Sequence, residues 1–334
     1  MQYGKKISII GAGGWGTALA ILLAENKNNV ILYEYFKDYT DLLNKKRENL
    51  KFLPGVKIPK EVKITNSLDE TLDNIDILIF AVPSKYLRNI LKDISKTHIS
   101  KNVIVLSVIK GIDYDTLNRI SVVIDKELNL KGRVAVLSGP SHAEEVSRKV
   151  PTAVVIASTN KSIANILQKI FSNYYFRAYT SQDVIGVELG GALKNVIALA
   201  KGILDGIGAG DNTKAALITR GLVEMKRLAV KMGAMSETLN GLAGIGDLIV
   251  TCMSKYSRNR MVGEKIGKGE KLEDISKSME MVAEGITTTS ACYKMSKIYK
   301  VEMPITNEVY NVLFRGKKPR EAINDLMKRG LKSE

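Results

Sequence analysis

The segment from Lys6 to Ala20 constrains the fold of this chain more than any other, and it reads KISIIGAGGWGTALA. An apolar run leads into Gly11, Gly13 and Gly16, spaced G-x-G-x-x-G, and then into residues that favour a helix. In a strand–turn–helix unit the first glycine permits the tight turn and the second lets the backbone approach a pyrophosphate. The third brings helix and strand close together. The segment therefore predicts the first unit of a dinucleotide-binding sheet, and a glycine turn without a ligand is the alternative.

The first 180 residues alternate apolar runs with helical patterns. The run Ile77–Val82 contains no polar residue, which is typical of a strand buried on both faces of a parallel sheet. The predicted strands are Ile7–Ile10, Val30–Glu34, Val62–Thr65, Ile77–Val82, Val103–Val108, Val134–Leu137 and Ala153–Ala157. Helices are expected between them, over Trp15–Asn26, Leu87–Ile94 and Leu117–Leu128. This pattern predicts a doubly wound, Rossmann-like α/β domain over residues 1–180.

Helical periodicity dominates from residue 181 onward. Helices are expected over Val187–Leu204, Thr213–Met232, Met261–Gly267, Thr287–Tyr299 and Glu308–Phe314. The glycine clusters at 206–210 and 241–246 are expected to form loops between helices. The second part of the chain, residues 181–334, is therefore predicted to be an all-helical domain.

Composition excludes several classes of protein. Hydrophobic residues make up 45% and charged residues 25%, which is ordinary for a globular chain with a buried core. No apolar stretch approaches the ~20 residues of a membrane span, and the first apolar run is too short for a signal peptide. Cys252 and Cys292 are too few for a disulfide framework and lack metal-ligand spacing. We therefore expect a cytoplasmic protein without a metal ion.

The chain is strongly basic, with a formal net charge of +15. Nucleic-acid binding is one interpretation of such a charge. The lysines are scattered, however, aromatic residues are only 6% of the chain, and no basic stripe with interleaved aromatics is present. A general attraction for anionic small molecules, such as a dinucleotide or a phosphorylated substrate, is the favoured interpretation.

The end of the second predicted strand bears on the choice of cofactor. Glu34 follows Gly16 by 18 residues, close to where an acid accepts hydrogen bonds from the adenosine ribose. A carboxylate at this place would repel a 2′-phosphate, which favours NAD over NADP. The alternative is a surface glutamate one position away, with Lys37 available to a phosphate, so NAD or NADP is expected with NAD slightly favoured.

Segments rich in turn residues follow three of the predicted strands: Ala81–Ser84, Ser107–Gly111 and Ser138–Ala143. Ligands of open parallel sheets bind beyond the carboxyl ends of the strands. Lys110 is therefore placed to hold a phosphate or hydroxyl group of a substrate. A solvent-exposed loop lysine is the alternative.

Redox chemistry on an alcohol needs a group that takes the hydroxyl proton as hydride leaves. The only histidines are His98, expected in an exposed segment, and His142, expected beside a helix start. Lys194 is the better candidate, because it lies next to Asn195 in the nearly apolar helical pattern Val187–Ala200. Partial burial would lower the pKa of its ammonium group toward a useful range.

Small residues, Gly190, Gly191 and Ala192, precede Lys194. They are expected to leave room for a flat ring to lie against this helix. The alternative for Lys194 is a helix lysine whose ammonium group extends to water.

A second polar cluster lies between residues 244 and 260. Asp247 and Thr251 are four residues apart, so they share one face of a helix, and Asp247 is placed to orient the ammonium group of Lys194. Arg258 offers the forked donors that suit a phosphate. An ordinary basic loop is the alternative for residues 258–260.

Taken together, these segments resemble the NAD(P)-dependent glycerol-3-phosphate dehydrogenases of bacterial type. The resemblance spans nearly the whole chain in order. Its matching stretches are Gly11–Ala20, Lys110–Gly111, Ser138–Ser141, Gly186–Ala198, Thr219–Leu222, Gly244–Leu248, Ser257–Arg260 and Glu302–Ile305.

The resemblance implies an oxidoreductase that interconverts sn-glycerol 3-phosphate and dihydroxyacetone phosphate with NAD(P)(H), supplies phospholipid synthesis and forms a homodimer. It implies that Lys194 is the proton donor and acceptor and that the helical domain binds substrate. The expected substrate contacts are Lys110, Gly139, Ser141, Lys194, Asn195, Asp247, Thr251, Ser257, Arg258 and Asn259. The expected cofactor contacts are Gly11, Gly13, Gly14, Trp15, Gly16, Glu34, Tyr35, Lys110, Ala143, Arg258, Val282 and Glu284.

Two positions depart from the family pattern. Many relatives carry serine where this chain has Gly14, and a basic residue or histidine near Tyr35 and Phe36. The second departure argues against strong NADP selectivity.

Two alternatives to the implied reaction stay open. One is a related dehydrogenase of a phosphogluconate or of ketopantoate, and the other is a dinucleotide-sensing protein without catalysis.

Overall fold

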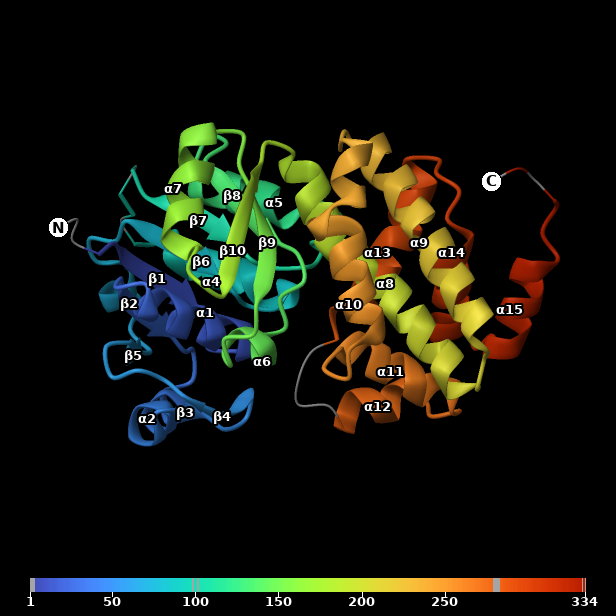
Figure 1. Cartoon of the computed structure of the whole chain (residues 1–334), viewed down its shortest axis with the longest axis horizontal. Helices are drawn as coiled ribbons and strands as arrows, with labels where there is room; N and C mark the ends of the chain where they lie inside the picture. Colours follow the sequence, from blue (N-terminus) through green and yellow to red (C-terminus); the bar gives the residue numbers. More distant parts are fainter. Residues whose placement is uncertain (1–3, 98, 101, 279–282, 332, 334) are drawn as a thin grey trace.

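The computed structural model describes residues 4–97, 99–100, 102–278, 283–331 and 333. Its amino-terminal half is built on an eight-stranded sheet with the order β10-β9-β8-β7-β6-β1-β2-β5. The strands are β1 (Lys6–Ile10), β2 (Asn29–Tyr33), β5 (Lys63–Thr65), β6 (Ile77–Phe80), β7 (Ile104–Ser107), β8 (Val134–Ser138), β9 (Thr152–Ala157) and β10 (Phe176–Ser181). A separate hairpin pairs β3 (Glu48–Asn49) with β4 (Leu53–Lys57). Figure 1 shows this sheet half beside a half made of helices.

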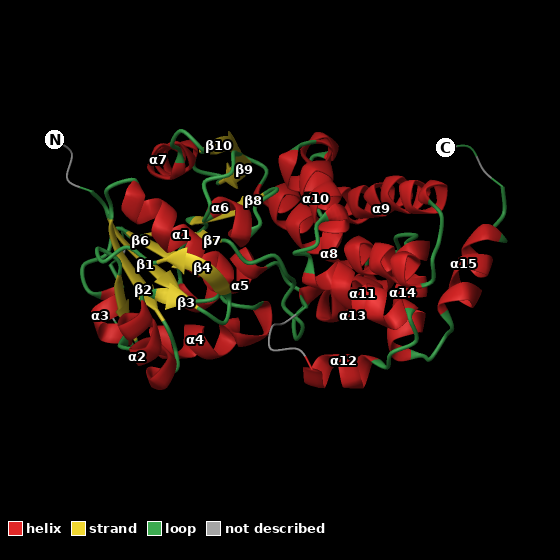
Figure 2. Ribbon diagram, turned by 60° about the horizontal axis from the view of Figure 1, so that its bottom comes forward, coloured by secondary structure: helices red, strands yellow, loops and turns green. Residues whose placement is uncertain are grey.

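Helices cover both faces of the sheet (Figure 2). They are α1 (Gly14–Glu25), α2 (Lys37–Lys46), α3 (Leu68–Leu72), the short η1 (Ser84–Tyr86), α4 (Leu87–Ile94), α5 (Ile120–Leu128), α6 (Ala143–Val146) and α7 (Lys161–Phe171). Alternate residues of β6 point to opposite faces, since Ile77 and Ile79 pack in one apolar cluster while Leu78 and Phe80 pack in another. The first cluster includes residues of α1 and α7, and the second includes residues of α4 and α5. The sheet is therefore buried on both sides, as its continuous apolar runs predicted.

The second half of the chain is helical from Val184 onward. Its elements are α8 (Val184–Gly206), α9 (Asp211–Lys231), the short η2 (Ser236–Asn240) and η3 (Leu242–Gly246), α10 (Asp247–Met253), α11 (Arg258–Gly267), α12 (Leu272–Ser278), α13 (Glu284–Ile298), α14 (Pro304–Phe314) and α15 (Pro319–Met327). Nearly every residue of α8 is buried, because it contacts β8 of the sheet and also α9, α10, α11 and α13. None of the helices described here is long and apolar enough to span a membrane.

The predicted class, a Rossmann-like sheet half followed by a helical half, is confirmed, with three corrections of detail. The β3–β4 hairpin and β10 were not predicted. The strand predicted at 153–157 exists as β9, but it runs antiparallel to β8. The connection from β8 to β9 contains only the four-residue helix α6, which is too short to serve as the covering helix of a parallel crossover.

The glycine cluster at 241–246 is the third correction. It was predicted to be a loop, whereas residues Leu242–Gly246 form a π-helical turn that continues into α10. A side chain at Gly244 would collide with the carbonyl oxygen of Leu239, 2.0 Å from the added carbon. The glycine here therefore permits close packing of two turns rather than an open loop.

Candidate active site

The glycine turn after β1 has the geometry of a pyrophosphate cradle. Gly11 has φ of +111°, a conformation that favours glycine, and a carbon added at Gly16 would lie 1.9 Å from the carbonyl oxygen of Gly11. A carbon added at Gly13 would meet nothing within 4 Å, so it opens onto free space. Gly13 is also the N-cap residue of α1 and offers no side-chain cap, which leaves N–H groups of the first turn for an anion. These residues fit a dinucleotide.

The β3–β4 hairpin packs against the glycine turn, a contact that no pattern in the sequence predicted. The buried side chain of Asn49 donates to the carbonyl oxygen of Ala12 (2.8 Å) and to Thr17 Oγ1 (2.7 Å). A carbon added at Gly14 would lie 2.7 Å from the carbonyl oxygen of Phe52. Glycine at this position therefore accommodates the hairpin.

Glu34 was expected to face the ribose of a dinucleotide, but its carboxyl group is turned into the protein. It is buried, and its Oε1 accepts a hydrogen bond from the backbone N–H of Phe36 at 3.0 Å. Burial raises the pKa of this carboxyl group, and the backbone hydrogen bonds oppose the rise. Tyr35 is 65% exposed at the same end of the sheet. The carboxylate therefore shapes the turn that presents Tyr35.

The segments that follow β7 and β8 meet α8 and α10 at one point, where a carboxylate binds two lysines. The Nζ of Lys194 donates to Asp247 Oδ1, and also to Thr251 Oγ1 at 2.6 Å. Lys110 Nζ donates to the other oxygen of Asp247 at 2.9 Å and to the carbonyl oxygen of Gly139 at 2.8 Å. Asp247 and Thr251 share one face of α10, as their spacing predicted.

Ser141 and Ser138 complete this network from the strand side. Ser141 Oγ accepts from Lys110 Nζ at 3.1 Å, and Ser138 Oγ donates to Asp247 Oδ2 at 3.3 Å. Ser138 was not among the predicted site residues. Its place at the carboxyl end of β8, directly before Gly139, was the signal that could have identified it.

Burial and the charges of neighbouring side chains shift the pKa values of Lys194 and Asp247. Lys194 is 5% exposed, and burial lowers the pKa of its ammonium group to about 7, with Lys110 lowering it further and Asp247 opposing. Burial alone would raise the pKa of Asp247, but the charges of Lys110 and Lys194 outweigh it and hold that pKa below its ordinary value. A lysine with a pKa near neutrality can both donate and accept a proton.

His142 lies beside the lysines and is held neutral. Burial, together with the charges of Lys194 and Lys110, lowers the pKa of its imidazole to about 4. Its Nε2 is buried and has no hydrogen-bond partner among the described residues. His98, the other histidine, lies outside the described residues.

The room expected beside Gly190 and Gly191 is filled by protein. A carbon added at Gly190 would lie 2.3 Å from the carbonyl oxygen of Ala243, and one added at Gly191 would lie 2.3 Å from Ser138 Oγ. The two glycines therefore let α8 approach the π-helical turn and the β8 segment, and the expectation of a ring against this helix is wrong for this face. The close approach brings Lys194 within reach of Asp247.

Two asparagines connect the cluster to α11 and α13. Asn195 Nδ2 donates to the carbonyl oxygen of Lys110 (2.9 Å), and its Oδ1 accepts from Asn259 Nδ2 (2.9 Å). Asn259 Oδ1 in turn accepts from the backbone N–H of Gly285 at 2.8 Å. Both amides therefore position the lysine segment and α13 in this structure. Ser257, another predicted contact, caps α11 through its hydroxyl group.

Arg258 is the first residue of α11, at the border of the two halves. Its side chain is exposed to solvent, yet surrounding protein lowers the pKa of its guanidinium group through desolvation, against the fields of Glu144 and Glu284. Both carboxylate oxygens of Glu284 accept hydrogen bonds from Ser84, from its N–H at 2.7 Å and its hydroxyl at 2.6 Å. This unpredicted contact links the segment after β6 to α13.

The remaining predicted cofactor contacts border the glycine turn. Trp15 is partly buried in α1, and its indole Nε1 has no hydrogen-bond partner among the described residues. Ala143 begins α6, and its Cβ would lie 3.7 Å from a carbon added at Gly14. Val282 lies outside the described residues.

The part of the chain that the structure describes contains no cluster of three or more histidine, cysteine, aspartate or glutamate side chains that could hold a metal ion.

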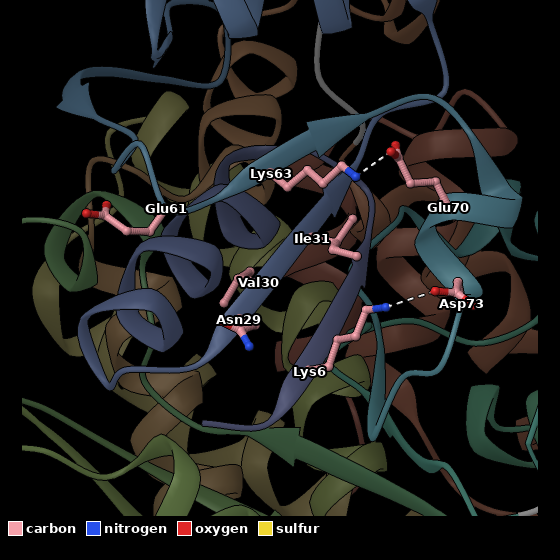
Figure 3. Close-up of a pocket in the computed structure, with 8 residues that line it drawn as sticks. All are labelled: Lys6, Asn29, Val30, Ile31, Glu61, Lys63, Glu70 and Asp73. Atoms are coloured by element: carbon pink, nitrogen blue, oxygen red, sulfur yellow. Dashed lines mark hydrogen bonds and ion pairs between the residues drawn. The ribbon is translucent and has the colours of Figure 1, made fainter. Parts of the chain in front are cut away.

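A concavity of ≈ 490 Å³ lies at the opposite end of the sheet (Figure 3). It includes Lys6, Asn29 and Lys63, which are the first residues of β1, β2 and β5. Its lysines are paired, Lys6 with Asp73 at 3.2 Å and Lys63 with Glu70. Ligands of such sheets bind at the carboxyl ends of the strands, so this concavity is not the active site.

Comparison with known proteins places the chain in a family. The models described as NAD-dependent glycerol-3-phosphate dehydrogenase N-terminus and C-terminus match residues 6–164 and 183–324. A glycerol-3-phosphate dehydrogenase (NAD(P)+) of Bacillus pumilus is 50% identical over 97% of this chain and 94% of its own. One of Fusobacterium nucleatum is 50% identical over 98% of each chain. The solved glycerol-3-phosphate dehydrogenase of Coxiella burnetii has a TM-score of 0.93 at 36% identity, covering 98% of this chain and 100% of that one. The chain therefore belongs to the NAD-dependent glycerol-3-phosphate dehydrogenase family.

Proposed function

We propose that this protein interconverts sn-glycerol 3-phosphate and dihydroxyacetone phosphate with a nicotinamide dinucleotide, and that Lys194 is its general acid and base. The single observation that carries the proposal is the buried ammonium group of Lys194, with a pKa of about 7, bound to Asp247 between the two halves. The related enzymes of Bacillus pumilus and Fusobacterium nucleatum are named for the same reaction.

Lys194 is the group that exchanges a proton with the substrate oxygen. In reduction, charged Lys194 stabilises the oxygen of the substrate as negative charge develops on it and then delivers a proton from Nζ. Asp247 and Thr251 fix the direction of that ammonium group, and Lys110 adds a second positive charge on the same carboxylate. In oxidation neutral Lys194 takes the hydroxyl proton. The nicotinamide, when bound, supplies or accepts the hydride.

Arg258 is the proposed phosphate ligand. It is the first residue of α11 and Asn259 is the second, so a guanidinium fork and the N–H groups of a helix start lie together. Binding energy from this non-reacting phosphate would align the carbonyl group with Lys194.

Several finer features belong to the same proposal. The residues around the glycine turn would hold NAD or NADP, with NAD slightly favoured because no cation occupies positions 34–36. The helical half, residues 181–334, would bind the substrate and form a homodimer. A role in supplying phospholipid synthesis and a cytoplasmic location complete the proposal, and the buried, unpaired Cys252 and Cys292 are in keeping with a reducing compartment.

Initial rates with a panel of substrates test the function. Purified protein should oxidise NADH or NADPH rapidly with dihydroxyacetone phosphate and far more slowly with ketopantoate, and it should not oxidise 6-phosphogluconate. A preference for either alternative substrate would reassign the reaction. Tight dinucleotide binding without turnover of any of the three would support the sensing protein instead.

A further inference from the structure

Glu188 is a buried carboxylate of α8 that the proposed mechanism does not use. It is 3% exposed, and its Oε1 accepts from the backbone N–H of Ser121 at 2.7 Å. Its Oε2 accepts from Ser121 Oγ at 2.6 Å and from Arg119 Nη1 at 2.7 Å. Helix α5 begins at Ile120 without a cap from its own side chains, so Glu188 caps it from the helical half.

The segment between Lys110 and Ser121 is a closed loop. Ile112 and Arg119 form an antiparallel bridge, and the N–H of Asp113 donates to the carbonyl oxygen of Asn118 at 3.0 Å. Ile112 is buried in the apolar cluster of the helical half. The two ends of the loop are therefore tied to each other and to the helices.

Helix α8 holds this loop at both ends. Asn195 binds the carbonyl oxygen of Lys110, and Glu188 binds Ser121. The two side chains are seven residues apart, which is about two helical turns, so they share a face of α8. Gly191 lies between them, and a carbon added there would be 3.4 Å from Lys110 Cγ. The loop is fixed along α8 at these points.

We propose that Glu188 is a positioning residue for the reaction: by holding the 110–121 loop on α8, it sets where the ammonium group of Lys110 lies relative to that of Lys194. This inference rests on the proposed acid–base role of Lys194. Because Lys110 and Lys194 bind the two oxygens of Asp247, a shift of Lys110 changes the proton affinity of Lys194. Among the described residues, the other titratable groups that face Lys194 are His142 and Cys252, and Glu188 binds neither of them.

The chain offers a matched control. Glu224 of α9 is also buried, and it caps α14 from another helix by accepting from the N–H of Ile305 (2.5 Å), the N–H of Thr306 (3.1 Å) and Thr306 Oγ1 (3.0 Å). Glu188 and Glu224 thus both cap a helix from another element, and Glu188 in addition binds Arg119. A purely structural role predicts that Glu188→Gln and Glu224→Gln both lose stability without a change in kcat or in its pH dependence.

The pH dependence of kcat for dihydroxyacetone phosphate reduction separates the two roles. In Glu188→Gln the alkaline limb should move to higher pH, since Lys110 no longer lowers the proton affinity of Lys194 as strongly. Its maximal kcat should fall roughly tenfold or more, because misplacement by about 1 Å can cost ~10²-fold. In Glu224→Gln thermal stability should fall while the limb and kcat stay as in the wild type.

Ser121→Ala provides a milder variant, should Glu188→Gln fail to fold, and it should move the limb in the same direction. If a folded Glu188→Gln or Ser121→Ala variant keeps the wild-type kcat and the wild-type position of the alkaline limb of its pH profile, the inference is overturned. Failure of the wild type to reduce dihydroxyacetone phosphate would instead overturn the proposed function, so the two failures are distinguishable.

Discussion

At the scale of single residues, the properties of Lys194 come from where its ammonium group lies. Burial removes water from the charge, and Lys110 adds repulsion, so the pKa of Lys194 falls to about 7. Reduction needs the protonated form, so kcat for dihydroxyacetone phosphate should fall as pH rises above about 7. Oxidation of glycerol 3-phosphate needs the neutral form, so its kcat should rise through the same range. Steady-state rates in both directions between pH 5 and 10 check this opposition, and parallel profiles would contradict it.

Arg258 and Arg260 lie two residues apart and have different predicted roles. Arg258→Ala should raise KM for dihydroxyacetone phosphate roughly 30-fold or more, because it removes a charge-assisted phosphate contact. Arg260→Ala is the control, since Arg260 Nε is bound to Asp205 at 2.8 Å, and its KM should stay close to that of the wild type. Equal KM values in the two variants would assign the phosphate to other residues.

At the scale of elements, alanine at two glycines of the β1–α1 turn should affect two different properties, NADH binding at Gly13 and stability at Gly16. Gly13→Ala has free space and an extended backbone (φ −70°, ψ −179°), so the melting temperature should hold while NADH binding weakens roughly tenfold or more. Gly16→Ala meets the carbonyl oxygen of Gly11 and should lose about 1–3 kcal/mol of stability or more. Calorimetry and fluorescence titration with NADH measure both quantities. Unchanged NADH affinity in Gly13→Ala would remove this turn from the cofactor site.

Helix α14 depends on a carboxylate from α9. Glu224→Ala leaves two backbone N–H groups at the start of α14 without their acceptor, so it should cost about 1–3 kcal/mol in free energy of unfolding. Burial raises the pKa of Glu224 to about 7, against its hydrogen bonds. The folded pKa is thus above the unfolded value, and the related stability is present below about pH 4.5 and lost as pH rises through 7. Chemical denaturation at pH 5 and 8 should show this decline in the wild type and not in Glu224→Gln.

The sequence predicted the elements that carry strong local patterns. The apolar runs and the glycine turn were sufficient for β1, β2 and β5–β9, and helical periodicity was sufficient for α8, α9 and α11. The direction of β9 and the β3–β4 hairpin were missed, because strand direction depends on the connection and a two-residue strand has no periodicity. The contacts of Glu188 and Ser84 join residues 67 and 200 positions apart, and no spacing rule reaches that far.

At the scale of the whole molecule, the site exists because one buried helix of the helical half also packs against the sheet. Helix α8 packs on β8 and on helices that include α9, α10, α11 and α13 (Figure 1). It brings Lys194 to the carboxyl ends of the strands, where Lys110 and Ser138 lie. The glycine turn lies at the same edge of the sheet. This arrangement would let a dinucleotide held by the sheet half meet a substrate held by the helical half.

The most direct test of the account is kcat for dihydroxyacetone phosphate reduction in Lys194→Ala, with Lys201→Ala as the control. Lys201 lies seven residues further along α8, is likewise buried, and is paired with Asp205 at 2.7 Å. If Lys194 is the general acid and base, kcat should fall by roughly 10²–10⁴ in Lys194→Ala and by little in a folded Lys201→Ala. A kcat for Lys194→Ala within a few-fold of the wild type would contradict it.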